Sequence, residues 1–114
     1  MTIGPKESYV VNACIRWLHQ QGCFIWRNNS GGYKTAHGNF IRFGLKGSPD
    51  IVGATPLGRF IGVECKAGRN KLTDDQIAFR DKMQAKGGIY IEARTLDDLE
   101  AMKAVILGNM GEMG

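Results

Sequence analysis

The sequence has no run of about 18 consecutive apolar residues, the length that a helix needs to cross a lipid bilayer. Its opening stretch, MTIGPKESYV, also lacks the basic and then apolar order of a secretory signal. We therefore expect a protein that is neither inserted in a membrane nor exported. Internal repeats, low-complexity segments and a dividing linker are absent as well, which predicts one domain over residues 1–114.

Cysteine is scarce, with three residues at Cys14, Cys23 and Cys65. An odd number in a chain without a secretory signal favours free thiols over a disulfide framework. The three positions are far apart and form no Cys-x-x-Cys or paired-histidine pattern, which argues against a zinc site.

Hydrophobic residues make up 43% of the chain, enough to build one core. Apolar spacing and turn residues predict an α/β fold with a mixed sheet, a core at about residues 5–107 and a flexible tail at 108–114. The expected order is a helix from Pro5 to Gly22, strands at 23–27, 40–43, 50–54 and 59–66, a helix opened by the capping box Thr73-x-x-Gln76, a strand at 89–93 and a last helix from Thr95. The strand–helix–strand unit at 59–93 predicts a parallel pair.

Residues 28–39 form a polar, glycine-rich segment that is too long for a tight hairpin turn. Its Asn, Ser, Lys and Tyr side chains could contact phosphates or stack on bases, or the segment could be a plain solvated loop. We expect His37 to be a surface residue rather than a metal ligand.

Net charge is +4, a modest excess whose distribution says more than its size. Basic residues lie on both sides of an acidic centre, an arrangement that suits a polyanion whose chemistry occurs at a bound metal. The candidate DNA-contacting residues are Arg27, Asn28, Ser30, Lys34, Arg42, Lys46, Ser48, Arg69 and Lys71.

The acidic centre lies in residues 47–66, GSPDIVGATPLGRFIGVECK. Side chains alternate along a strand, so Glu64 and Lys66 share one face while Cys65 points into apolar packing. If the two strands of this stretch pair as a hairpin, Asp50 comes alongside Glu64. Such a cluster is costly unless a divalent cation binds there.

Magnesium prefers oxygen ligands and keeps several waters, so Asp50, Glu64 and the backbone carbonyl of Cys65 suffice as protein ligands. Lys66 could position or deprotonate the attacking water, or stabilise the phosphate in the transition state. Taken alone, Glu-x-Lys on a strand is an ordinary structural pair. The joint pattern favours chemistry, because acid and base within an apolar strand need an explanation.

Two further residues have roles that local sequence predicts. Glu7 falls in the first turn of the first helix, where it complements the helix dipole. Gln76 caps the second helix.

The combination Ser48-Pro49-Asp50 followed by Glu64-Cys65-Lys66 resembles the PD-(D/E)XK nuclease signature, and more narrowly the small stand-alone VRR-NUC branch of phages and bacteria. Supporting motifs are Arg27-Asn28-Asn29-Ser30-Gly31, GLKGSPD ending at Asp50, Leu72-Thr73-x-x-Gln76-x-x-Phe79, and Gly87-Gly88.

The resemblance implies a restriction-endonuclease-like αβββαβ core with flanking helices and hydrolysis of DNA phosphodiesters with Mg²⁺ or Mn²⁺. Asp50, Glu64 and Lys66 would form the catalytic core, Glu7 would bind the metal through a water, and Gln76 would reach the site. Small members of the branch act as homodimers on branched DNA such as Holliday junctions. We accordingly expect a homodimer in the cytoplasm of a bacterium or phage-infected host.

Other functions remain open. The chain could nick or cut linear duplex DNA, it could be a DNA-binding module without chemistry, or it could be a structural domain with buried ion pairs. Candidates for an apolar dimer interface are Phe24, Trp26, Phe40, Phe43 and Met102.

Overall fold

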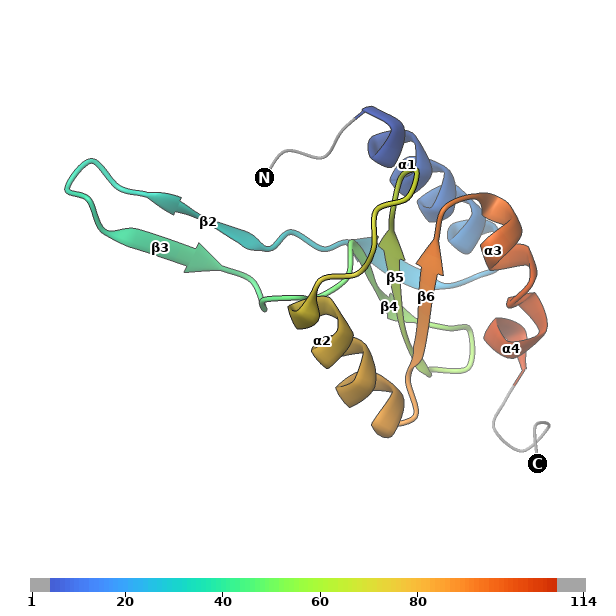
Figure 1. Cartoon of the computed structure of the whole chain (residues 1–114). Coiled ribbons are helices and arrows are strands. Elements are labelled where there is room, and N and C mark those ends of the chain that lie inside the picture. The colour runs from blue at the N-terminus through green and yellow to red at the C-terminus, as the bar shows by residue number, and fades with distance from the viewer. Residues whose placement is uncertain (1–4, 109–114) are drawn as a thin grey trace.

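The computed structural model of the chain describes residues 5–108 (Figure 1). Ten elements follow one another: α1 Pro5–Gln20, β1 Phe24–Arg27, β2 Gly31–Lys34, β3 Phe40–Phe43, β4 Ile51–Ala54, β5 Phe60–Cys65, α2 Asp74–Ala85, β6 Ile89–Ala93, α3 Leu96–Glu100 and α4 Lys103–Leu107. The predicted α/β class and the mixed sheet are confirmed.

The main sheet has four strands in the order β1-β4-β5-β6. The pairs β1–β4 and β4–β5 are antiparallel, while β5 and β6 are parallel, as the strand–helix–strand unit predicts. The β4–β5 connection is the expected tight turn, in which the Gly58 N–H donates to the Thr55 carbonyl at 2.9 Å. The register of the β4–β5 pair places Ile51 opposite Val63 and thereby fixes which residues meet at the end of the hairpin.

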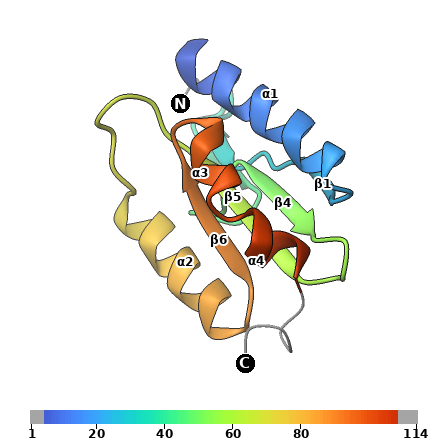
Figure 2. The ribbon, with the colours of Figure 1, turned by 90° about the vertical axis from the view of Figure 1, so that its right-hand side faces the viewer.

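Helices cover both faces of the main sheet (Figure 2). Helices α1, α3 and α4 lie on one face, and α2 lies on the other, over β5 and β6. The larger core is under α1, whose predicted apolar stripe is buried at Val11, Cys14 and Leu18. Burying each such aliphatic side chain stabilises the fold by about 1.5–3 kcal/mol. On the α2 face, the buried apolar residues include Val52, Met83 and Tyr90.

The segment predicted as a loop at 28–39 contains strand β2, which pairs with β3 in a separate two-stranded sheet. The expectation that 28–39 is a loop without a strand was therefore wrong, and strand β3 pairs with β2 outside the main sheet. Glycine is a poor strand residue, which hid β2 from pattern analysis. Aromatic rings take the missing side chains' place: Phe43 lies over Gly31 and Phe40 over Gly32.

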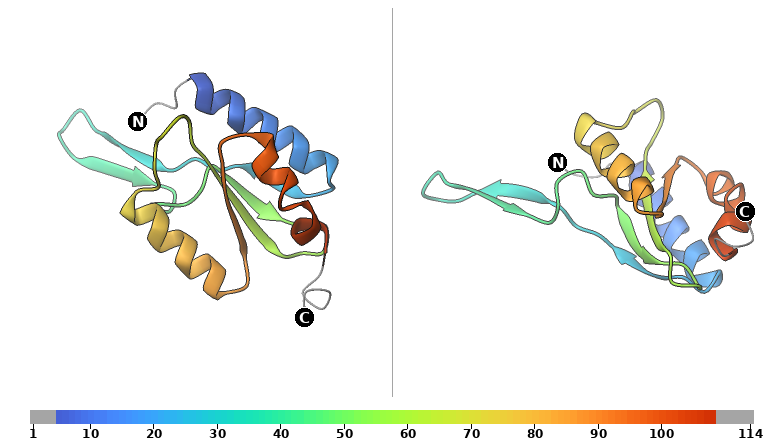
Figure 3. Two further views of the ribbon diagram at one scale, coloured as in Figure 1. Left: turned by 45° about the vertical axis from the view of Figure 1, so that its right-hand side comes forward. Right: turned by 90° about the horizontal axis from the view of Figure 1, so that it is seen from below.

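We call residues 31–43, which comprise β2, β3 and the turn between them, the arm. It projects from the main sheet in Figure 1 and in both views of Figure 3, and the molecule measures 54 × 29 × 24 Å along its principal axes. The turn is closed by the Thr35 N–H, which donates to the Asn39 carbonyl at 2.7 Å.

The single last helix that we expected is divided into α3 and α4. The Met102 N–H donates to the Leu99 carbonyl, three residues back, in the tighter pattern that ends an α-helix. Two short helices bring both Leu99 and Ile106 into the core. Met102 is partly buried and packs against that core.

Some predictions about the periphery changed or lie outside the described residues. From the apolar spacing of the second helix we expect Ala78 to be buried, but it is exposed on α2. Apart from Gly108, the expected tail at 108–114 is outside the described residues. None of the helices within 5–108 combines the length and the apolar character needed to span a bilayer.

Candidate active site

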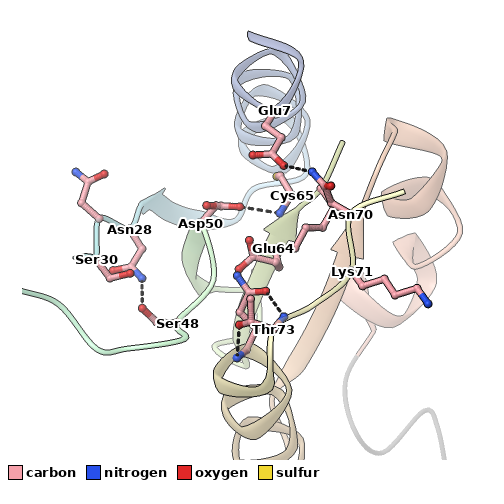
Figure 4. A pocket seen from close by; sticks show the side chains of 13 residues that line it. Glu7, Asn28, Ser30, Ser48, Asp50, Glu64, Cys65, Asn70, Lys71 and Thr73 are labelled. Carbon is pink, nitrogen blue, oxygen red and sulfur yellow. Dashed lines mark hydrogen bonds between the residues drawn. The ribbon is translucent and has the colours of Figure 1, made fainter. Parts of the chain in front are cut away.

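A polar pocket of about 590 Å³ opens where the start of α1, the ends of β1 and β5, the start of β4 and the start of α2 meet (Figure 4). All five predicted catalytic residues line it, although they come from distant parts of the sequence. The lining residues are Glu7, Asn28, Asn29, Ser30, Ser48, Asp50, Glu64, Cys65, Lys66, Asn70, Lys71, Thr73 and Gln76.

Asp50 and Glu64 enter the pocket from adjacent strands (Figure 4). Asp50 directly precedes β4, and the β4–β5 register brings it opposite Glu64. The Cys65 backbone N–H donates to Asp50 Oδ2 at 2.8 Å, so the β5 backbone holds the Asp50 carboxylate. The proximity that the sequence predicted therefore occurs.

Glu64 is only 4% exposed. Burial is the main reason that the pKa of its carboxyl is raised to about 9, and the hydrogen bond with Asp50 and the charges of Asp50 and Glu7 act in the same direction. The Lys66 ammonium acts against them. A buried carboxyl group with two acidic neighbours and one basic neighbour is an environment that a further positive charge would stabilise.

The turn that carries Asp50 is held by Asn28, the residue that follows β1. The Asn28 side-chain amide donates to Ser48 Oγ at 2.7 Å and to the Pro49 carbonyl at 2.9 Å. Its backbone N–H donates to the Asp50 carbonyl at 2.7 Å. Predicted as a DNA contact, Asn28 lines the pocket but uses its amide nitrogen to position the Asp50 turn.

Packing against β5 and α2 also holds the turn that carries Asp50. Pro49 is fully buried against β5 and α2, where any side chain at Gly62 would collide with Pro49 and Met83. Gly47 has a φ of +81°, and a Cβ there would lie 2.3 Å from the backbone carbonyl oxygen of Asp75 in the first turn of α2. Only glycine therefore fits at this contact between the turn and α2.

Glu7 reaches the pocket from the first turn of α1. Its Oε1 accepts hydrogen bonds from the Ala67 N–H at 3.3 Å and from Asn70 Nδ2 at 3.4 Å (Figure 4). Its charge also contributes to the raised pKa of Glu64. Glu7 is thus part of the pocket, and complementing the helix dipole is not its only role.

Gln76 both caps α2 and lines the pocket. Its Oε1 accepts from the Thr73 N–H at 2.9 Å, and the Gln76 N–H donates to Thr73 Oγ1 at 3.2 Å, which completes the capping box. The residue also lines the pocket. The Oε1 atom serves the cap, and the amide N–H₂ group is the part of the side chain suited to donate to a ligand.

Cys65 lines the pocket through its backbone, because its side chain is 2% exposed and belongs to the core. The three cysteines of the chain are buried and free, in agreement with the sequence prediction. The donors available to a cation are therefore the carboxylates of Asp50, Glu64 and Glu7 and backbone oxygen. Hard oxygen donors of this type fit Mg²⁺ or Mn²⁺.

Within residues 5–108, no three or more His, Cys, Asp or Glu side chains already converge on one point as a preformed metal cluster. The Glu7 carboxylate accepts from the loop after β5, and Asp50 Oδ2 accepts from Cys65. Asp50 and Glu64 therefore lie next to each other on adjacent strands, while the loop after β5 holds the Glu7 carboxylate separately.

The nine predicted DNA contacts separate into two groups. Asn28, Ser30, Ser48 and Lys71 line the pocket, although Lys71 extends away from the two central carboxylates in Figure 4. The others lie outside it: Lys34 and Arg42 on the arm, Arg27 at the end of β1, Arg69 exposed in the loop after β5, and Lys46, whose Nζ lies 3.2 Å from Asp75 Oδ2.

Sequence reasoning missed Asn29, Asn70 and Thr73 as lining residues. Asn70 lies in the loop after β5, which is anchored where the Arg94 guanidinium donates to the Asn70 carbonyl. The predicted contacts in that loop are its basic residues, Arg69 and Lys71, whereas the residue that hydrogen-bonds to Glu7 is an amide. Thr73 was recognised only as a helix cap.

Comparison of the chain with known protein families, curated proteins and solved structures found no match.

Proposed function

We propose that the protein is a Mg²⁺- or Mn²⁺-dependent endodeoxyribonuclease of the VRR-NUC type that hydrolyses phosphodiester bonds in branched DNA, Holliday junctions in particular. The observation that carries this proposal is the pairing of Asp50 with the buried Glu64 in a pocket that also contains Lys66 and Glu7. A pocket built only to bind phosphate would not present acidic groups to it.

The cation would be held by Asp50, Glu64 and the Cys65 carbonyl, with Glu7 acting through a water. Once bound, such an ion lowers the pKa of a coordinated water and neutralises charge on phosphate oxygens. The raised pKa of Glu64 supports this assignment, because a divalent cation offsets the repulsion among the three carboxylates.

The remaining pocket residues have distinct proposed roles. Lys66 lines the pocket with Glu64, and its positive charge acts to lower the pKa of the Glu64 carboxyl. It is therefore suited to orient the water or to bind the scissile phosphate. Gln76 can donate from its amide to the same phosphate. Asn28 is a positioning residue that holds the Asp50 turn.

The order of the elements that build the main sheet and its covering helices supports the proposed restriction-endonuclease-like topology. Without the arm, the first six elements are α1, β1, β4, β5, α2 and β6, which is the αβββαβ order that the resemblance implies, and α3 and α4 follow them. The three antiparallel strands followed by a parallel fourth are compatible with that core.

We further propose that the enzyme acts as a homodimer, because symmetric cleavage of a junction needs two sites related by a twofold axis. Phe24 and Trp26 on the edge strand β1 are 74% and 50% exposed, with ring centroids 5.7 Å apart. Sedimentation tests this surface: Trp26→Ser should convert a dimer to a monomer, and an unchanged mass would assign the interface elsewhere.

Cleavage of four-way, flap and linear DNA in Mg²⁺ and Mn²⁺ tests the function. Wild-type protein should cut the four-way junction, while Asp50→Ala and Lys66→Ala should abolish cutting and retain DNA binding. Preference for linear duplex would instead indicate a nicking or restriction-like nuclease. Binding without any cutting would indicate a non-catalytic DNA-binding module, and unchanged cutting by either variant would disprove the assigned site.

A further inference from the structure

The arm has two chemically different faces, because cross-strand partners in an antiparallel pair share a face. The register pairs Tyr33 with Ile41 and Gly31 with Phe43, so one face, the apolar face, carries Tyr33, Ile41 and Phe43. The opposite face, the cationic face, carries Lys34, Phe40 and Arg42, and the Arg42 guanidinium carbon lies 5.5 Å from the Phe40 ring centroid.

The apolar face has no cover within the described part of the chain. Tyr33 is 56% exposed, Phe43 45% and Ile41 42%. The arm is hydrogen-bonded only as its own two-stranded sheet, and such an isolated hairpin is marginally stable in water. Three large side chains on one exposed face indicate a surface that acts by binding.

The charge of the surrounding sequence indicates what binds. Between Glu7 and Asp50 the chain contains no acidic residue, while Lys34 and Arg42 contribute two positive charges to the arm itself. A polyanion is attracted to this arm. A second arm is not, because two arms packed together would bring four basic side chains near one another.

The arm is also continuous with the pocket. The residues just before β2, Asn29 and Ser30, line the pocket, as does Ser48 in the segment that returns from β3. The two ends of the arm meet closely, since a Cβ at Gly44 would lie 2.6 Å from the Asn29 carbonyl oxygen. The base of the arm is therefore part of the pocket wall, so a polymer bound in the pocket lies within reach of the arm.

We propose that the arm is a DNA-binding ribbon that recognises the branch point of the substrate. Lys34 and Arg42 contact phosphates, and Tyr33 and Phe43 stack on bases whose own stacking is interrupted. Continuous duplex does not expose base faces, whereas a branch does, so the apolar face provides selectivity for branched DNA. This inference rests on the proposed nuclease function, whose substrate it specifies.

Fluorescence anisotropy with the full-length protein in EDTA, where no cutting occurs, tests the inference. A four-way junction and a linear duplex of equal length are compared at several salt concentrations. Loss of one stacked base costs roughly 5- to 100-fold in affinity. Tyr33→Ala should therefore reduce the junction-to-duplex affinity ratio by roughly tenfold, and Tyr33→Phe, which keeps the ring, should restore it.

Two further variants complete the design. Lys34→Ala should lower the salt dependence of junction binding by about one unit of slope, as expected for one phosphate contact. Leu57→Ala, which removes an exposed apolar side chain from the distant β4–β5 turn, should leave both affinities unchanged. Even if Tyr33→Ala disrupts the arm, the slope measured for Lys34→Ala reports on the phosphate contact.

The inference is overturned if Tyr33→Ala and Lys34→Ala bind both DNAs like the wild type. It is also overturned if sedimentation shows that Tyr33→Ala converts a dimer to a monomer, because a second copy then covers the apolar face. A separate cleavage assay distinguishes the two proposals. If the wild type cuts DNA and the arm variants bind like the wild type, only the proposed role of the arm is refuted. If binding depends on the arm but no metal-dependent cutting occurs, only the proposed nuclease function is refuted.

Discussion

Asp50 lies across from Glu64 because Ile51 pairs with Val63, and the Cys65 N–H fixes the Asp50 carboxylate at that position. The two acids are thus placed by backbone geometry before any ligand binds. Several measurable consequences follow from this pairing and from the contacts that support it.

Without divalent cations, stability should fall as pH rises between about 4.5 and 9. The folded protein keeps a proton on Glu64 up to a pKa of about 9, whereas the unfolded chain releases it near 4.5. The folded state binds more protons in this window, so the free energy of unfolding decreases with pH, by up to about 1.4 kcal/mol per pH unit.

Thermal unfolding in EDTA across this pH range measures the effect, and Glu64→Gln should flatten the profile. Added Mg²⁺ should raise the melting temperature most at the alkaline end. A flat wild-type profile in EDTA would contradict the burial of an uncompensated Glu64 carboxyl.

Asn28→Ala should loosen the Asp50 turn. It removes both side-chain hydrogen bonds to Ser48 and Pro49, at a cost of about 1–3 kcal/mol in stability. Loss of a positioning contact should weaken Mn²⁺ binding by about 10- to 100-fold. Calorimetric titration measures this affinity, and Asn12→Ala, at an exposed position on α1, is the control. Equal affinities in the two variants would refute the positioning role.

Gly47→Ala should destabilise the protein far more than Gly58→Ala. Both glycines have positive φ, +81° and +88°, but only at Gly47 would a Cβ collide with the Asp75 backbone. The conformational cost alone is about 1–2 kcal/mol, and the collision should add about 1–3 kcal/mol at Gly47. Urea unfolding of both variants gives the comparison. Similar losses would mean that the contact between the turn and α2 relaxes easily.

The two roles of Gln76 can be separated by substitution. Gln76→Glu keeps an oxygen acceptor for the Thr73 N–H and therefore the capping box, but it replaces the amide donor with a negative charge. We expect near wild-type stability and at least a tenfold loss of cleavage. Gln76→Ala should also lose about 1 kcal/mol of helix capping. Full cleavage by Gln76→Glu would leave Gln76 as a cap only.

Local sequence signals predicted the central site well. The four-residue turn at 55–58 and the strand alternation determine the pairing of Asp50 with Glu64, and the Thr73–Gln76 capping box depends on residues three apart. These features are set by residues that are close together in the sequence, so their spacing alone predicts them.

Features that depend on distant contacts were not predictable in the same way. Strand β2 forms because rings of β3 cover its glycines, and no property of GGYK alone indicates this. The ion pair between Lys46 and Asp75 forms because the turn before Asp50 packs on α2, a contact that local sequence does not indicate. Asn70 joins the pocket through its hydrogen bond to Glu7, from an element far away in sequence.

The central claim is that Asp50 and Glu64 together hold a divalent cation, and calorimetric titration with Mn²⁺ tests it most directly. Wild-type protein should bind Mn²⁺, Asp50→Asn and Glu64→Gln should each lose that binding, and Asp81→Asn, at an exposed position beside Arg80, should bind like the wild type. Equal Mn²⁺ binding by wild type, Asp50→Asn and Glu64→Gln, or no binding by the wild type, would contradict the claim.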